Sequence, residues 1–134
     1  MDMAISPSNS GESAIDRWDQ LHEVLASQER RMIIYSLKDA PEERRMPLPE
    51  AAMTPESSWD QERTTLRLMH DHLPKLADAG YVRWERDPFC VQRGPHFEEV
   101  EVLFNLIHES IGQFPSSLIT GCEIYEELYH DVRQ

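Results

Sequence analysis

The stretch from Ser58 to Gly94 reads SWDQERTTLRLMHDHLPKLADAG and continues as YVRWERDPFCVQRG. Residues 58–79 predict one long helix, because Ser58 followed three residues later by Gln61 is a capping-box signal and Gly80 suits the position after a helix end. Residues 81–92 predict a two-stranded ribbon, since apolar and polar residues alternate over 81–85, Arg86-Asp87-Pro88 suits a turn and residues 89–92 suit a return strand. A helix followed directly by a β-ribbon is the arrangement that a winged helix-turn-helix presents to DNA.

Helical periodicity assigns two faces to the predicted helix. One is an apolar stripe that we expect to face the core: Leu66, Met69, Leu73 and Leu76. A second face, more than about 100° away at helical spacing, carries Arg63, Arg67, His70 and Asp71. Pro74 removes a backbone hydrogen bond inside this helix, which costs roughly 3 kcal/mol, so the sequence predicts a kink or a break near residues 70–74.

The flanking sequence predicts further helices and one more strand. Helices are expected over 12–26, over 28–39 with Ser27 as the cap, over 49–53, and twice after Phe97; residues 46–48 suit a short edge strand. The predicted fold is mainly α with a small β-ribbon, a winged helix-turn-helix with extra C-terminal helices. We expect a disordered lead over 1–11, a winged-helix domain over 12–95 and a helical extension over 96–134.

The net charge of −12 is unevenly distributed. Residues 58–94 hold six basic and six acidic side chains, whereas 95–134 hold Arg133 against eight acids. The whole negative charge therefore lies outside the helix-and-ribbon stretch, although nucleic-acid binders usually carry a basic face. The basic residues are eleven arginines and two lysines, a composition that suits a halophilic protein because acidic groups stay hydrated and molar salt screens their repulsion.

Other functional classes find little support in the sequence. It has no catalytic motif and no metal-ligand spacing around Cys90 or Cys122, so we expect no enzyme, no cofactor, no metal and no evident small-molecule ligand. There is also no apolar run of roughly 18 residues and no secretory signal, so we expect no membrane association and a cytoplasmic location with free thiols.

Residues 70–82, HDHLPKLADAGYV, resemble the second half of the recognition helix and the wing entry of ArsR-like winged-helix regulators. The likeness is closer to a family of small haloarchaeal winged-helix proteins, which share an Arg-rich segment, here residues 27–32, and the block from His72 to Gly80. The resemblance covers about residues 15–95 and implies a winged-helix fold that binds DNA. Asp71 departs from it, because ArsR-like helices often carry a basic residue there.

Seven residues are candidate contacts to double-stranded DNA: Arg63, Arg67, His70 and Lys75 on the helix, and Arg83, Arg86 and Arg93 on or beside the wing. The alternative is a solvated surface with internal Arg–acid pairs and a charged ribbon edge that prevents edge pairing. We expect the extension over 96–134 to form a homodimer, as two half-sites require; alternatively it completes the monomer core. The rival function is a winged-helix protein-interaction module that binds no DNA.

Overall fold

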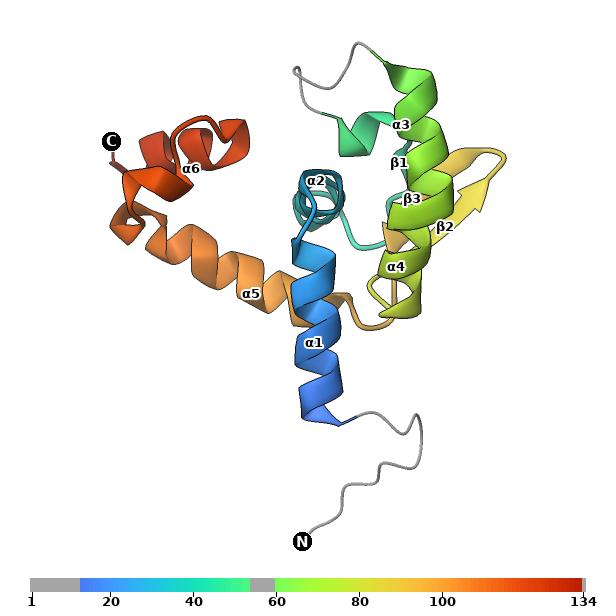
Figure 1. The fold of residues 1–134 in the computed structure, drawn as a ribbon, viewed down its shortest axis with the longest axis horizontal. Helices are drawn as coiled ribbons and strands as arrows, with labels where there is room; N and C mark the ends of the chain where they lie inside the picture. The colour runs from blue at the N-terminus through green and yellow to red at the C-terminus, as the bar shows by residue number, and fades with distance from the viewer. Residues whose placement is uncertain (1–12, 54–59, 134) are drawn as a thin grey trace, which may run out of the picture.

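The computed structural model of the chain describes residues 13–53 and 60–133 and is mainly helical, with one small antiparallel sheet (Figure 1). The predicted class, mainly α with a small β-ribbon, is confirmed. The elements in chain order are α1 (Ala14–Leu25), α2 (Gln28–Lys38), β1 (Met46–Pro47), η1 (Glu50–Ala52), α3 (Gln61–Arg67), η3 (Leu68–His72), α4 (Leu73–Asp78), β2 (Val82–Arg86), β3 (Phe89–Arg93), α5 (Phe97–Ser110), η4 (Ile111–Gln113), η5 (Ser116–Leu118) and α6 (Glu123–Arg133). The η1, η4 and η5 segments are 3₁₀ turns, and η3 is a π-helical turn.

Local capping signals set the first two helices. Ser13 and Asp16 form a capping box at the start of α1, and the Ser27 side chain accepts from the backbone N–H of Arg30 at the start of α2. Both helices agree with the predicted ranges to within two residues. The segment over residues 1–12, including the expected disordered lead, lies outside the described residues.

One continuous helix, formed by α3, η3 and α4, replaces the helix predicted over 58–79; we call it the central helix. It begins at Gln61, with Asp60 as the N-cap that accepts from the backbone N–H of Arg63 at 3.1 Å. The Ser58 cap lies outside the described residues. The irregularity expected near residues 70–74 takes the form of the π turn, in which the N–H of Leu73 bonds to the carbonyl of Leu68.

This π turn changes which side chains of the central helix face the core. Leu66 was predicted to be buried and is 51 % exposed, whereas Leu68 is fully buried. The predicted stripe holds at Leu73 and Leu76. An inserted residue moves the inward face of the earlier turns back by one position, from 66 and 69 to 65 and 68, so the prediction for Leu66 was wrong because it assumed an unbroken α-helix.

The three strands form a sheet in the order β1-β3-β2, with every pair antiparallel. The ribbon predicted over 81–92 is the β2–β3 hairpin, in which Arg86 pairs with Phe89 around the Asp87-Pro88 turn. Strand β1 lies at one edge, as its prolines predicted. Gly80 ends the central helix with φ of +83°, and the N–H groups of Gly80 and Tyr81 bond back to Ala77 and Leu76, which is a Schellman motif.

A single hydrophobic core runs across the boundary that the sequence suggested at 95/96. Phe97, Val100 and Phe104 of α5 belong to the same buried cluster as Ile33 and Leu73. Side chains of α6 pack against that cluster as well. Helix α5 leads away from the sheet, and α6 turns back from the far end of α5 toward α2 (Figure 1). The C-terminal helices thus share one core with α2 and the central helix.

Candidate nucleic-acid interface

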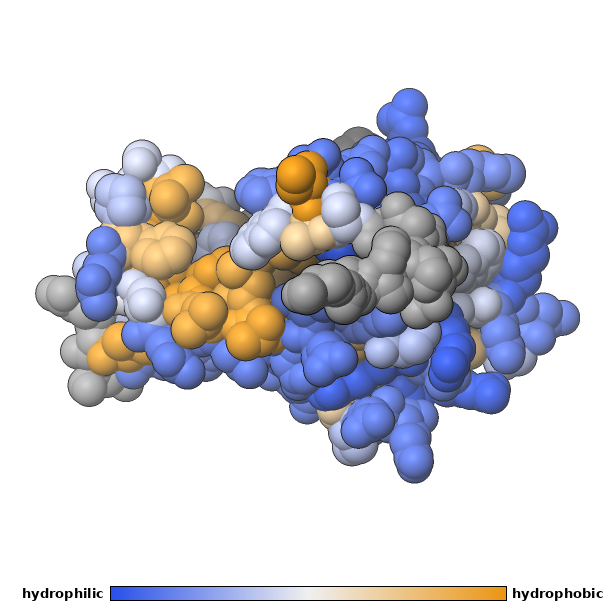
Figure 2. Space-filling view, turned by 90° about the horizontal axis from the view of Figure 1, so that it is seen from below, coloured by the Kyte–Doolittle hydropathy of each residue, from blue (hydrophilic) through white to orange (hydrophobic). Residues whose placement is uncertain are grey.

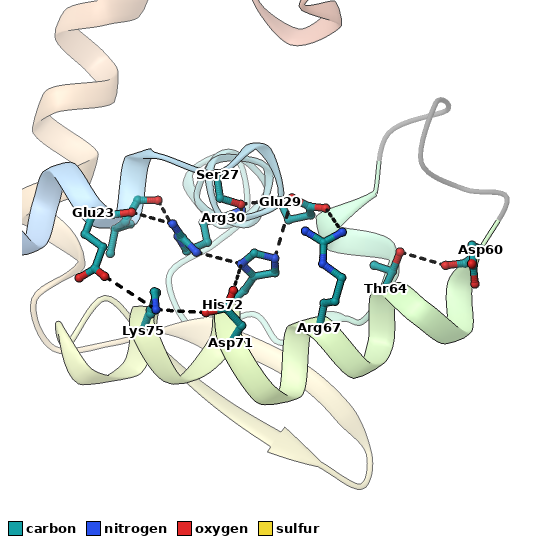
Figure 3. Close-up of polar contacts among 11 residues, drawn as sticks. Glu23, Ser27, Glu29, Arg30, Asp60, Thr64, Arg67, Asp71, His72 and Lys75 are labelled. Carbon is teal, nitrogen blue, oxygen red and sulfur yellow. Dashed lines mark hydrogen bonds and ion pairs between the residues drawn. The ribbon is translucent and has the colours of Figure 1, made fainter.

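The central helix carries four of the candidate DNA contacts that the sequence singled out. Arg63, Arg67 and His70 are exposed, and Lys75 is half-buried. The Arg67 guanidinium lies 3.5 Å from Glu29, and the Lys75 ammonium lies 3.1 Å from Asp71 and 3.7 Å from Glu23 (Figure 3). The internal Arg–acid pairing considered as an alternative therefore exists for Arg67 and Lys75. Such exposed pairs contribute only about 0–1 kcal/mol, so a phosphate could displace them at small cost.

The β2–β3 hairpin adds a second cationic segment. Arg83 and Arg86 are exposed on β2, the sheet edge opposite β1. Helix α4 packs against β2, which fixes the hairpin beside the C-terminal half of the central helix. In Figure 1 the hairpin extends beyond the helix, with the Asp87-Pro88 turn at its tip. Five of the seven candidate residues are thus exposed, three on the central helix and two on the hairpin packed beside it; Arg83 and Arg86, three positions apart on β2, point to opposite faces of the hairpin.

Arg93 lies elsewhere and has a structural role. Its side chain is 16 % exposed, and its guanidinium donates to the backbone carbonyls of Leu37, Lys38 and Ala40 at 3.1–3.2 Å. It also lies 3.3 Å from the carboxylate of Glu101. Leu37 and Lys38 belong to the last turn of α2 and Ala40 follows it, at a helix end where carbonyls lack the usual i+4 donors. We therefore leave Arg93 out of the candidate interface.

A buried arginine–histidine contact lies directly beneath this surface (Figure 3). Arg30 and His72 are 5 % and 3 % exposed, and Nη1 of Arg30 donates to Nδ1 of His72 at 3.0 Å. Arg30 also donates from Nε to the carbonyl of Val24 at 2.9 Å and from Nη2 to the carbonyl of Glu23 at 2.7 Å. One guanidinium thereby joins the end of α1, the start of α2 and the π turn.

The charges around this contact influence one another. Burial lowers the pKa of His72; the carboxylates of Glu29 and Asp71 oppose that shift, whereas the cations Arg30 and Arg67 add to it. The pKa of Glu29 is lowered: burial acts to raise it, but its backbone hydrogen bond, Arg67 and His72 outweigh burial. The hydrogen bond from Lys75 lowers the pKa of the Asp71 carboxyl. Near neutral pH the interior therefore holds an uncharged imidazole between an arginine and a carboxylate.

Sequence reasoning assigned the Arg-rich segment 27–32 only to a family likeness and missed what its arginines do. Arg30 binds the carbonyls at the end of α1, and Arg31 donates to the carbonyl of Leu25 in the same turn. Arg17 does the same for the central helix, donating to the carbonyl of Ala79 at 2.8 Å and to Glu99 at 2.7 Å. Arginines soon after a helix break were the available signal, but their acceptors are identified only by the tertiary fold.

An apolar groove of about 350 Å³ runs between α1 and α5. Trp18 and Val102 line it and are 53 % and 57 % exposed; Leu106 lines it too, and Ile15 lies exposed on the same helix as Trp18. Figure 2 shows apolar side chains gathered on this side of the molecule. At helical spacing Ile15 and Trp18 share one apolar side of α1 with Leu21 and Val24, yet the core buries only Leu21 and Val24.

The described residues, 13–53 and 60–133, contain no group of three or more His, Cys, Asp or Glu side chains that could hold a metal ion. No helix in this part of the chain is both long enough and apolar enough to cross a membrane.

Comparison with known proteins gives a family and no function. No curated protein and no solved structure has a significant match to the chain. The model of a family described as a domain of unknown function, DUF7344, matches residues 22–92, just over half of the 134 residues. The matched part runs from the last turn of α1 to the end of the β2–β3 hairpin and includes both Arg30 and His72. The chain therefore belongs to the DUF7344 family.

Proposed function

We propose that this protein is a cytoplasmic DNA-binding transcriptional regulator of the winged helix-turn-helix type, related to the ArsR-like haloarchaeal regulators. The central helix would enter the major groove and the β2–β3 hairpin would lie along the backbone. The observation that carries the proposal is the shared exposure of Arg63, Arg67 and His70 on the helix and of Arg83 and Arg86 on the hairpin packed beside it.

The order of elements supports this proposal. Helix α2, strand β1, the turn η1, the central helix and the β2–β3 hairpin follow one another as helix, strand, short helix, long helix and wing. The serine hydroxyl of Ser36 on α2 donates to the carbonyl of Ala51, so η1 is held against the preceding helix. The central helix packs against α2 through the buried contact between Arg30 and His72, and Arg63 and His70 stay exposed, as groove reading requires.

The charge distribution constrains how such binding would work. Attraction to phosphates weakens steeply as salt rises, and this chain has net charge −12 with a neutral helix-and-ribbon stretch. Bidentate contacts from Arg63 or Arg67 to guanine edges depend less on long-range attraction. We infer that base-edge contacts and groove shape supply most of the specificity, as expected for a halophilic protein.

We further propose that the protein is a homodimer and that the groove between α1 and α5 is the shared face. Helix α6, the other part of the expected dimerisation extension, packs against the monomer core through Ile124, Tyr125 and Leu128. Exposed Trp18 and Val102 leave the α1–α5 face uncovered within one copy. A two-fold contact there would give two central helices for two half-sites.

The rival proposal is a winged-helix module that binds another protein and no DNA. The same apolar groove favours it, because exposed apolar patches mark protein-interaction sites, and so does the absence of net positive charge on the candidate interface. In this reading Arg67 and Lys75 would stay in their ion pairs with Glu29 and Asp71.

DNA binding decides between the two proposals. Fluorescence anisotropy is measured with the DNA upstream of the gene that encodes this chain, at low and at molar KCl. The test variant combines Arg63→Ala and His70→Ala; the control is Arg133→Ala, which removes a charge from α6. We expect saturable binding that the double variant weakens by at least roughly tenfold and the control leaves unchanged. Absence of saturable binding, or equal loss in the control, would favour the interaction module.

A further inference from the structure

The imidazole of His72 is held in one tautomer. Arginine carries only donors, so the Arg30 contact at 3.0 Å requires Nδ1 of His72 to accept and places the ring proton on Nε2. Nε2 is buried and has no hydrogen-bond partner within the described chain; the nearest carboxylate oxygen, Oε1 of Glu29, lies 3.9 Å away. The ring therefore has one satisfied acceptor and one unsatisfied donor in the interior, an arrangement that costs free energy.

Adding a proton to His72 would reverse its interaction with Arg30. Nδ1 would become a donor facing the donor Nη1, and two cations would stand 3.0 Å apart in a buried site. The groups that face the ring come from two elements: Glu29 and Arg30 from α2, and Arg67 and Asp71 from its own helix. Glu29 and Asp71 would favour the added proton, whereas burial, Arg30 and Arg67 oppose it and hold the pKa of His72 below its usual value.

The contact between Arg30 and His72 holds the segment of the central helix that carries part of the candidate interface. His72 is the last residue of the π turn, and Asp71, His70 and Arg67 belong to the same or the preceding turn. Arg30 is fixed from the other side by the carbonyls of Glu23 and Val24 at the end of α1. A π turn interrupts the regular α-helical hydrogen-bond ladder, so this turn of the central helix depends more than its neighbours on outside contacts.

We propose that His72 is a proton-sensitive positioning residue: neutral, it holds the π turn against Arg30, and protonated, it releases that turn and misaligns the exposed face of the central helix. The part that concerns DNA affinity rests on the function proposed above. The release itself is a property of the fold and can be measured without DNA.

Two histidines two residues apart on one helix allow a matched experiment. His72→Asn keeps an acceptor close to the position of Nδ1 but does not titrate, so it should hold the π turn against Arg30 at every pH. His70→Asn removes the neighbouring exposed histidine and is the control for the NMR readout, whereas His130→Asn, which removes an exposed histidine of α6 outside the candidate interface, is the control for DNA affinity. A third variant, His72→Phe, removes the acceptor and should leave the turn released near neutral pH, if it folds.

Two readouts are recorded between about pH 7.5 and about pH 5. Histidine ¹⁵N and backbone amide NMR spectra report the tautomer and the position of residues 67–73, and anisotropy reports DNA affinity. In the wild type and in His70→Asn we expect the amides of the π turn to shift together with protonation of His72. We also expect affinity to fall by up to about tenfold for each pKa unit that separates the locked and released states. In His72→Asn both changes should be absent.

The proposal is overturned if His72→Asn keeps the pH response of the wild type, if His70→Asn abolishes the amide shifts of the π turn, or if the spectra place the neutral ring's proton on Nδ1. Release of the π turn and DNA binding can be distinguished by their separate readouts. If the π turn shifts with pH but the protein binds no DNA, the release of the turn by His72 protonation is supported and the proposed function is rejected. If the protein binds DNA with an affinity independent of His72 protonation, the proposed function is supported and the role of His72 is rejected.

Discussion

Nη1 of Arg30 lies 3.0 Å from Nδ1 of His72, although 42 positions separate the two residues in the sequence. The contact joins α2 to the π turn of the central helix, and both side chains are almost completely buried. A buried cation needs hydrogen-bond partners, and each of the three guanidinium nitrogens of Arg30 has one: Nη1 reaches His72, and Nε and Nη2 reach two carbonyls at the end of α1. Stability and the orientation of the candidate interface therefore depend on the same side chain.

We expect Arg30→Met to destabilise the protein by roughly 3–5 kcal/mol, because it removes the hydrogen bonds to two helix-end carbonyls and leaves the buried Nδ1 of His72 without a donor. Arg30→Lys should recover little, since a single ammonium cannot reproduce the planar fork. Urea denaturation followed by circular dichroism measures the free energy of unfolding. The control is Arg44→Ala in an exposed turn, with an expected change within about 0.5 kcal/mol. Equal stability of Arg30→Met and Arg44→Ala would contradict the prediction.

Stability should fall on the acid side because of His72. Its pKa in the folded state is below the usual 6.5, so the unfolded chain binds the proton more tightly. The stabilising contribution is complete above pH 6.5 and is lost as the pH falls from 6.5 towards the folded-state pKa. Denaturation midpoints measured across this window should decline less steeply in His72→Asn than in the wild type. An unchanged slope in that variant would show that other groups cause the decline.

Gly94 should not tolerate a side chain. A Cβ at this position would lie 2.6 Å from the carbonyl oxygen of Gly80 and 2.7 Å from the backbone nitrogen of Val82. Backbone atoms cannot move aside as a flexible side chain can, so we expect Gly94→Ala to cost roughly 1–3 kcal/mol. Gly112→Ala is the control, since its Cβ would make an ordinary contact with Val132 at 3.5 Å. Thermal denaturation of the two variants should differ by several degrees; equal melting temperatures would be inconsistent with the close backbone approach.

The proposed dimer should depend on the α1–α5 groove. Val102→Glu places a charge in that groove without touching the core, so we expect it to yield a monomer with an unchanged helical spectrum. Leu118→Glu is the matched control, because Leu118 is equally exposed, at 57 %, but lies in η5. Sedimentation velocity at molar KCl, where repulsion between acidic copies is screened, gives the oligomeric state. A wild type that is already monomeric, or a Val102→Glu dimer, would reject this interface.

Arg86 and Arg93 should behave in opposite ways. Arg86 is exposed at the hairpin turn, so Arg86→Ala should reduce the salt dependence of DNA binding by about one phosphate contact and leave stability nearly unchanged. Arg93→Ala removes the donors at the end of α2 and should cost roughly 1–3 kcal/mol of stability without changing that salt slope. Anisotropy titrations at several salt concentrations, together with urea denaturation, test both. A reduced salt slope for Arg93→Ala would return it to the interface.

Local signals in the sequence determined most of the element boundaries. Ser27 begins α2, Gly80 ends the central helix with positive φ, and Asp87-Pro88 forms the hairpin turn, each because the residue's own backbone and side-chain chemistry favours that conformation. The exposure of Arg63, Arg67 and His70 also followed from helical spacing alone. These features depend on residues within a few positions of one another, so a single sequence contains enough information.

Only the tertiary structure decided which charged residues are buried and which turn of the central helix faces inward. Periodicity placed Leu66 in the core, but the π turn that accommodates Pro74 substitutes Leu68. From the sequence, Arg93 was a candidate DNA contact and Arg30 was only part of a family likeness, yet each donates to carbonyls at the end of a helix. Their acceptors come from other elements, and His72 comes from 42 positions away. Contacts of that kind depend on how the helices pack, which no local pattern of residues specifies.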